Sequence, residues 1–165
     1  MKKTNKGFSM VELIIVIAIM AILAGALAPA LIKYINKSRV STDIQTGNTI
    51  ATACQTALSN EKGYDDASSS TYNATWVSMV TLWGNSDNFA DSVKSTVGGN
   101  AAPGVKSKKC IAKTGAVATG GPFEIYVDPV ANTVKVRMGG NHLIYPTADD
   151  CLTNEVATAC SASAT

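Results

Sequence analysis

The sequence predicts an α+β protein in which a long amino-terminal helix packs, through its second half, on an antiparallel β-sheet. Three observations predict this fold: a 20-residue run without charge, Leu13–Ile32, then an amphipathic stripe at helical spacing, then several short strands. With 165 residues the chain has room for one domain, which excludes a multidomain enzyme. The net charge of +2 and the aromatic content of 6% exclude bulk nucleic acid as a partner, and no specific nucleic acid is expected.

The first element is an apolar helix that follows a basic segment. Residues Met1–Gly7 contain three lysines and no acid, which is typical of a cytoplasmic flank beside a membrane span. Of the 20 residues in Leu13–Ile32, 18 are hydrophobic, and as a helix they would reach about 30 Å, the thickness of a bilayer's hydrocarbon core. This segment is long enough to cross a membrane.

A secretory signal peptide is the alternative interpretation, because Ala26 and Ala28 form an A-x-A pattern. Two features count against it: Pro29 would directly follow the cleavage site, and the apolar run exceeds the usual length. Glu12 also argues against a plain anchor. A carboxylate costs on the order of 3 kcal/mol near the centre of a membrane helix and less near an interface, so Glu12 is expected to have a partner.

The amino-terminal residues resemble the start of a type IV prepilin. In that family a short basic leader ends in Gly, the mature chain begins with Phe, and Glu stands fifth; here these residues are Gly7, Phe8 and Glu12. Pro29 falls at the family's usual mid-helix proline. The resemblance covers residues 2 to about 40. It implies cleavage after Gly7 by a prepilin peptidase, N-methylation of Phe8, and subunit assembly through Phe8, Glu12 and Pro29.

The resemblance also implies how the chain is organised. Residues 1–7 would be a cleaved leader, residues 8–32 a transmembrane and polymerisation helix, and residues 33–165 a globular headgroup that includes the half-helix to about residue 60. Cleavage would remove three positive charges and leave 11 basic against 12 acidic side chains, so the lysine anchor would be lost. The new α-amino group of Phe8 would lie one helical turn from Glu12, and the two charges could compensate each other within or between subunits.

Gly25 and Pro29 predict a soft spot in the helix. Pro29 lacks an N–H and clashes with the carbonyl of Gly25, itself a weak helix former. Ala21 occupies a position where many family members have Gly. The alternatives are a harmless kink in a membrane helix and a segment that stretches in a filament.

The helix is expected to continue into the headgroup. The stripe Val40, Ile44, Gly47, Ala51, Cys54 and Leu58 advances in steps of 4, 3, 4, 3 and 4. A helix from Phe8 to about Asn60 would have 53 residues and span roughly 80 Å. Residues 59–75, rich in Ser, Asn, Asp and Thr, are expected to form a loop.

The rest of the chain predicts one short helix and a sheet. The helix is expected from Ala74 to about Trp83, where apolar residues are dense. The predicted strands are Cys110–Val117, Phe123–Val127, Thr133–Met138 and Leu143–Tyr145. Turns are expected at Asp128, Pro129 and Asn132 and at Gly139–Asn141.

Four cysteines, Cys54, Cys110, Cys151 and Cys160, favour disulfides over zinc, because their number is even and no CxxC occurs. Three pairings are open. A bond between Cys151 and Cys160 resembles the carboxyl-terminal disulfide loop of many pilins, and Cys54 with Cys110 would then join helix to sheet. Free buried thiols are the alternative.

The search for catalytic and ligand-binding motifs predicts neither an enzyme, a cofactor nor a metal. Gly99–Ser107 only approaches a phosphate-binding loop, and His142 has no second His beside it. Three further patterns have ordinary explanations. Asp149, Asp150 and Glu155 are explained by a solvated acidic loop, and Lys106, Lys108, Lys109 and Lys113 by lysines that protect a sheet edge. The glycosylation sequon from Asn73 to Thr75 is explained by chance in a segment of this composition.

The sequence therefore predicts a subunit of a type IV pilus-like extracellular filament, inserted in the cytoplasmic membrane before assembly. The partners implied by the resemblance are identical or related pilin subunits, a prepilin peptidase, and an assembly ATPase with its inner-membrane platform. A type II secretion pseudopilin or minor pilin is the first alternative. The second is a single-pass anchored binding or adhesion domain that never polymerises, which would keep its amino-terminal lysines.

Overall fold

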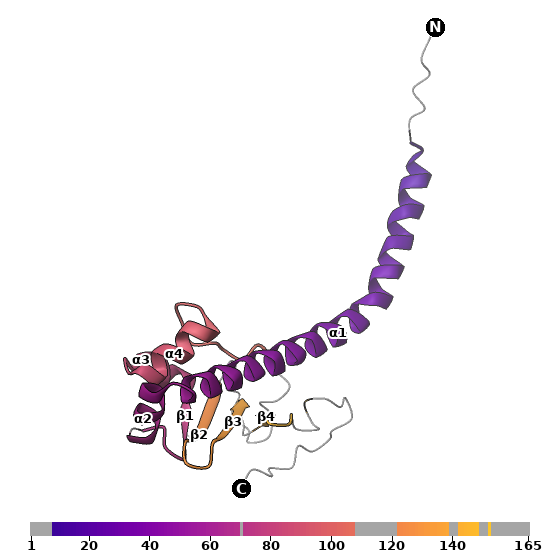
Figure 1. Ribbon diagram of the computed structural model, residues 1–165. Coiled ribbons are helices and arrows are strands. Elements are labelled where there is room, and N and C mark those ends of the chain that lie inside the picture. The colour runs from indigo at the N-terminus through magenta and orange to yellow at the C-terminus, as the bar shows by residue number, and fades with distance from the viewer. Residues whose placement is uncertain (1–7, 70, 108–121, 139–141, 149–151, 153–165) are drawn as a thin grey trace. The chain divides into compact units, whose positions relative to one another are not determined.

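The computed structural model describes residues 8–69, 71–107, 122–138, 142–148 and 152 (Figure 1). The chain divides into two compact units, residues 1–37 and residues 38–165. One helix, α1 (Met10–Leu58), supplies most of the first unit and the first element of the second. Its bounds confirm the helix expected between Phe8 and about Asn60. The described fold confirms the predicted α+β class.

The start of α1 is set by Ser9 and Glu12. The Ser9 carbonyl accepts a hydrogen bond from the Leu13 N–H at 3.2 Å, so Ser9 is the N-cap residue. The Ser9 N–H donates in turn to Glu12 Oε2 at 3.1 Å. A glutamate three residues after an N-cap serine forms this bond in the capping box, in which two otherwise unpaired helix-end donors are satisfied. Phe8 and Ser9 therefore precede the helix.

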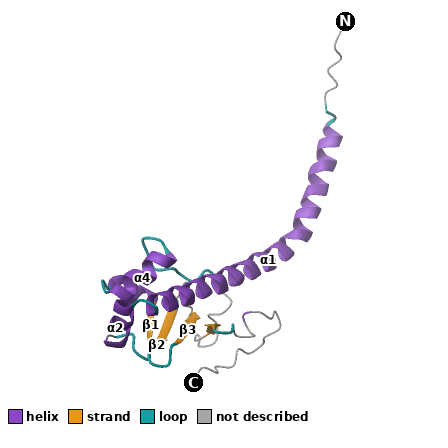
Figure 2. Cartoon of the chain, in the orientation of Figure 1, coloured by secondary structure: helices purple, strands orange, loops and turns teal. Residues whose placement is uncertain are grey.

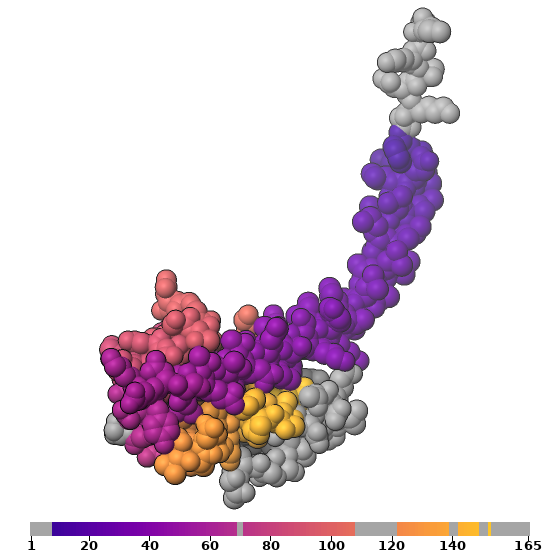
Figure 3. Space-filling view, viewed as in Figure 1, coloured from indigo at the N-terminus to yellow at the C-terminus, as the bar shows by residue number. Residues whose placement is uncertain are grey.

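The second half of α1 buries the predicted stripe against the headgroup. Val40, Gly47, Ala51, Cys54 and Leu58 are buried, and Ile44 packs half-buried against the same core. At Gly47 the helix comes so close to the sheet that an added Cβ would lie 2.6 Å from Ile144 Cγ2. The opposite face of this half-helix lies at the surface of the headgroup (Figure 3).

The sheet has four antiparallel strands in the order β1-β2-β3-β4, and α1 lies across one of its faces (Figure 2). The strands are β1 (Thr75–Ser78), β2 (Glu124–Asp128), β3 (Thr133–Met138) and β4 (His142–Tyr145). Alternate residues point into the core: Val77, Ile125, Val127, Val134, Val136, Met138 and Ile144. The three predicted strands within residues 123–145 are confirmed.

The turn predicted between β2 and β3 is also confirmed. Asp128 Oδ1 accepts a hydrogen bond from the Ala131 N–H at 2.9 Å, and Asn132 adopts a positive φ of 50°. Two other expectations, the strand Cys110–Val117 and the turn Gly139–Asn141, lie outside the described residues.

Two expectations for residues 59–83 are wrong. The expected loop contains a helix, α2 (Glu61–Ser69), and the expected helix from Ala74 is instead β1 followed by α3 (Met79–Gly84). Thr75–Ser78 form a strand because they pair with β2, a long-range contact that local composition does not reveal. Ser78 then caps α3 by accepting a hydrogen bond from the Val80 N–H at 3.1 Å. A further helix, α4 (Asn88–Val97), was not anticipated.

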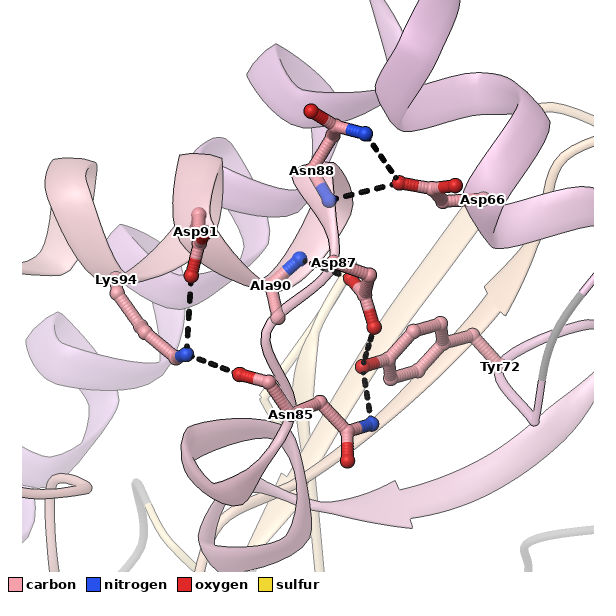
Figure 4. Close-up of polar contacts among 8 residues, drawn as sticks. All are labelled: Asp66, Tyr72, Asn85, Asp87, Asn88, Ala90, Asp91 and Lys94. Carbon is pink, nitrogen blue, oxygen red and sulfur yellow. Dashed lines mark hydrogen bonds and ion pairs between the residues drawn. The ribbon is translucent and has the colours of Figure 1, made fainter.

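Helices α2 and α4 are joined to the segment around Tyr72 by a polar network (Figure 4). Tyr72 Oη donates to Asp87 Oδ2 at 2.9 Å and accepts from Asn85 Nδ2 at 2.5 Å. Asp87 also caps α4 through the Ala90 N–H, at 2.7 Å. Burial raises the pKa of Tyr72, and the neighbouring Asp87 carboxylate raises it further, while the hydrogen bond from Asn85 lowers it.

Asp66 completes the network. Its Oδ2 accepts hydrogen bonds from the Asn88 backbone N–H at 2.7 Å and from Asn88 Nδ2 at 2.9 Å. This carboxylate of α2 therefore binds the first residue of α4, where the helix dipole favours negative charge. The network fixes the end of the headgroup that follows α1.

Candidate functional site

The first functional feature is the apolar surface of α1 in residues 8–35. Among the described residues α1 alone is long and apolar enough to span a membrane, with a mean hydropathy of 2.7 over its most apolar stretch and none of that stretch buried. The exposed apolar side chains are Phe8, just before the helix, and in α1 Met10, Val11, Leu13, Ile14, Ile15, Val16, Ile17, Ile19, Met20, Ile22, Leu23, Leu27, Leu31, Ile32 and Ile35. Between Leu13 and Ile32 this surface carries no charge, and an apolar surface of this size requires lipid or other apolar helices around it.

Glu12 has a partner within its own chain. The predicted cation, the α-amino group of Phe8, exists only after cleavage, whereas in the uncleaved chain Glu12 Oε2 accepts the hydrogen bond from the Ser9 N–H. A carboxylate in the first turn is also favoured by the positive end of the helix dipole. Phe8 is 85% exposed, and Gly7 lies outside the described residues. The ion pair between Phe8 and Glu12 stays a prediction.

Gly25 and Pro29 lie within an uninterrupted α1. Because Pro29 has no N–H, the carbonyl of Gly25 lacks its usual helical partner. A Cβ added at Gly25 would meet nothing within 4 Å, so this glycine is not required by packing in the single chain. Whether these two residues let the helix stretch stays a prediction.

Cys54 is a fully buried thiol with no disulfide partner among the described residues. Its predicted partner Cys110 lies outside them, so the pairing of these two cysteines stays a prediction. Burial raises the pKa of the Cys54 thiol to about 12, so it is protonated and unreactive at neutral pH. The other three cysteines, Cys110, Cys151 and Cys160, lie outside the described residues. The pairing of Cys151 with Cys160 stays a prediction.

A residue that the sequence reasoning missed is Asp43. Its side chain is 1% exposed, and its two carboxylate oxygens accept hydrogen bonds from consecutive backbone N–H groups, those of Lys106 at 2.9 Å and Ser107 at 2.7 Å. This carboxylate fastens the segment before the undescribed residues 108–121 to α1. The sequence feature that could have identified Asp43 is its position three residues after Val40, on the apolar side of the helix, where an acid needs hydrogen-bond donors.

The described residues include only part of the remaining candidate groups. Among the residues the structure describes, no group of three His, Cys, Asp or Glu side chains could hold a metal ion. His142 is buried in β4, and Asn73 Nδ2 donates to the Ser68 carbonyl at 3.1 Å. Lys106 is exposed, whereas the other predicted lysines and the acidic loop lie outside the described residues: Lys108, Lys109, Lys113, Asp149, Asp150 and Glu155.

Comparison with known proteins decides the family. Residues 2–28 match the prokaryotic N-terminal methylation motif. Over 126 residues the chain is 35% identical to the type IV major alpha-pilin of Moraxella bovis, a match that covers 67% of this chain and 76% of that protein. The chain belongs to the type IV pilin family. The prokaryotic methylation motif includes the predicted junction between Gly7 and Phe8 and the acidic residue Glu12.

Two further pilin relatives support this assignment. Type IV major fimbrial proteins FimA of Dichelobacter nodosus are 39% and 40% identical to this pilin over 66 and 62 residues, and the first match covers 40% of this chain and 41% of that protein. No solved structure matches the chain. Type IV pilins are structural proteins, and the apolar half of α1 is this pilin's candidate membrane anchor.

Proposed function

We propose that this pilin is the structural subunit of a type IV pilus-like extracellular filament and polymerises through the amino-terminal half of α1. The observation that carries the proposal is the exposed apolar surface of residues 8–35, joined to a headgroup with its own buried core. In a membrane, lipid covers this surface; in a filament, the same surface of other subunits does. The names of the relatives, major pilin and major fimbrial protein, favour a major subunit over a pseudopilin or minor pilin.

Processing is part of the proposal. A prepilin peptidase removes residues 1–7, the new amino group of Phe8 is methylated, and an assembly ATPase with its membrane platform supplies the work of extraction. The chain itself acts as a structural subunit and not as an enzyme. It resides in the cytoplasmic membrane before assembly and at the cell surface afterwards.

Terminal sequencing and mass spectrometry of sheared cell-surface material, viewed in parallel by electron microscopy, test this proposal. We expect filaments whose main protein begins at N-methylated Phe8. Surface protein that retains Met1 and forms no filaments would instead favour the anchored binding domain. A start near Pro29 would indicate an ordinary secreted domain.

Glu12 has a specific role in this proposal: it forms an ion pair with the Phe8 amino group of an adjacent subunit entering the filament. A carboxylate in a dry core needs a cation, and the new amino group, with a reference pKa of roughly 7.7 to 8.0, supplies one. The Ser9 N–H satisfies one carboxylate oxygen but does not neutralise the charge.

Substituting Glu12 separates its charge from its hydrogen bond. Glu12→Gln keeps an acceptor for the Ser9 N–H, as Gln does in the capping box, but carries no charge. We expect Glu12→Gln and Glu12→Ala both to leave cleavage after Gly7 largely intact and to abolish filaments, whereas Glu12→Asp restores part of the yield. The measurement is filament protein in sheared fractions relative to cleaved protein in membranes. Normal filaments from Glu12→Gln would show that assembly does not need the charge.

A further inference from the structure

Among the described residues, exposed charges of opposite sign lie on either side of an uncharged stretch of α1. Residues 44–60 contain no charged side chain. Before this stretch lies a basic end, defined by the exposed residues Arg39 and Lys106; the Lys106 N–H binds Asp43, one helical turn after Arg39. After it lies an acidic end, defined by the exposed residues Glu61 and Asp65 of α2; Lys62 between them is also exposed, and the net charge of these three residues is negative. The two ends carry opposite charge.

The acidic end keeps a net negative charge, and hydrogen bonds hold it in place. Residues 61–97 contain five acidic and two basic side chains. Among the described residues two ion pairs form, Lys94 with Asp91 and Arg137 with Glu124, so neither Glu61 nor Asp65 has an ionic partner there. The hydrogen bonds from Asn88 to Asp66 hold α2 against α4, which fixes where the acidic end presents its carboxylates (Figure 4).

The two ends are too far apart to neutralise each other within one headgroup. The intervening helix, residues 38–58, has 21 residues, which at 1.5 Å each span about 30 Å. The Debye length at physiological ionic strength is about 8 Å, so exposed charges at this separation are largely screened from each other. The two ends can therefore neutralise each other by direct contact only when they belong to different molecules.

The α1 surface between the two ends is suited to being covered. The exposed residues of α1 there are Ser41, Gln45, Asn48, Thr49, Thr52, Gln55 and Thr56, and the exposed Ser59 follows the helix. All are polar and uncharged, so covering them desolvates no ion. The hydroxyls of Thr49, Thr52, Thr56 and Ser59 each donate to the carbonyl four residues earlier, at 2.9–3.0 Å. These donors are therefore not left unpaired when another surface excludes water.

We propose that the acidic end of one subunit binds the basic end of a second copy of this chain, with the uncharged surface of α1 lying inside the contact. Two different surfaces meet in such a contact, so it is heterologous and repeats from subunit to subunit, which generates an open filament. The inference rests on the proposed function and adds to it the headgroup surfaces that join neighbouring subunits. Complementary charges also fix the direction in which subunits add.

Charge reversal and charge exchange test this contact in cells that express the full chain. Glu61→Lys with Asp65→Lys reverses the acidic end, and Arg39→Glu with Lys106→Glu reverses the basic end. Each reversal places like charges together, so we expect about tenfold or greater loss of filament in sheared fractions. The variant with all four substitutions restores opposite charges and should recover most of the yield.

Two controls separate this contact from other effects. Val130→Lys with Ala131→Lys adds positive charge at the exposed turn between β2 and β3 and should leave the yield unchanged. The fluorescence of the headgroup tryptophans, followed through urea unfolding, checks that every variant is folded. Normal yield from either reversal, or no recovery in the folded fourfold variant, would overturn the inference. Absence of filaments from the unaltered chain would instead overturn the proposed function.

Discussion

Replacing Gly47 by Ala tests how tightly α1 must approach the sheet. The added Cβ would lie 2.6 Å from Ile144 Cγ2 and 2.9 Å from its Cδ1, whereas non-bonded carbons prefer about 3.5–4.0 Å. Ile144 is 1% exposed and surrounded by the core, so its side chain has no free space to enter. The helix or β4 must therefore move by several tenths of an ångström or more.

The expected cost follows from two opposing effects. Overpacking a core costs about 1–3 kcal/mol, while Ala stabilises a helix interior relative to Gly by about 1 kcal/mol. We expect a net loss of up to about 2 kcal/mol in the free energy of unfolding of the headgroup, and a stability about 1–3 kcal/mol below that of a Gly→Ala control without the close contact. Gly84→Ala is the matched control, because a Cβ there would meet nothing within 4 Å, and it should be neutral or slightly stabilising.

The assay is urea unfolding of the detergent-solubilised chain, followed by tryptophan fluorescence. The two tryptophans of the chain, Trp76 and Trp83, lie in β1 and α3, so their emission reports on the headgroup alone. Ile144→Ala removes the contacting methyl groups, and it should cost at least about 1 kcal/mol less in the Gly47→Ala chain than in the unaltered chain. Equal costs in both chains, or a Gly47→Ala chain as stable as the Gly84→Ala control, would refute the close-approach argument.

Three further predictions concern the headgroup. Tyr72→Phe should lower the free energy of unfolding of the headgroup by about 1–3 kcal/mol, because Asp87 and Asn85 lose a buried partner. Since folding raises the pKa of Tyr72, the stabilisation contributed by its protonated hydroxyl should be complete below about pH 10 and fall above it. Urea unfolding should find this decline weaker in the Phe variant. Asp43→Ala should speed amide hydrogen exchange at Lys106 and Ser107, whose N–H groups lose their acceptors, and unchanged rates would contradict the fastening role. Peptide mapping without reductant should find Cys151 joined to Cys160, and reduction of this bond should lower the free energy of unfolding of the headgroup by about 2–4 kcal/mol. The buried Cys54 thiol, with its pKa of about 12, should resist alkylation at neutral pH until the headgroup unfolds.

The parts of the fold that the sequence predicted are those with a clear period or clear turn residues. The 4, 3 spacing from Val40 to Leu58 identified the buried face of α1, and the turn residues at Asp128–Asn132 separated the segments that form β2 and β3. Helix α2 has no such pattern, and its polar sequence contains Gly63, where an added Cβ would lie 2.3 Å from the Ala57 carbonyl oxygen. Close packing on the end of α1 and hydrogen bonds to α4 favour this helix, and neither can be read from local composition.

The candidate site was predictable where it consists of a local motif. Gly7, Phe8 and Glu12 are recognised by order and spacing alone, and the family match includes all three. Asp43 was not predictable in the same way, because its role depends on two backbone N–H groups more than 60 residues away in the chain. The charge separation between Arg39 and Asp65 likewise needs the fold, since it becomes a surface property only when α2 is placed after α1.

The hydrogen bond between Ser9 and Glu12 explains how one carboxylate could serve both the precursor and the filament. Before cleavage no amino group is available at Phe8, yet Glu12 already begins an apolar helix; the Ser9 N–H and the helix dipole then lower the cost of its charge. An amino group on Phe8 would have to compete with that hydrogen bond or share the carboxylate, whose second oxygen, Oε1, remains available to it. Sharing requires no change in the start of α1, so assembly could use the helix end already formed in the membrane. The same bond holds Glu12 within one helical turn of Phe8, where the proposed ion pair with a second subunit would form.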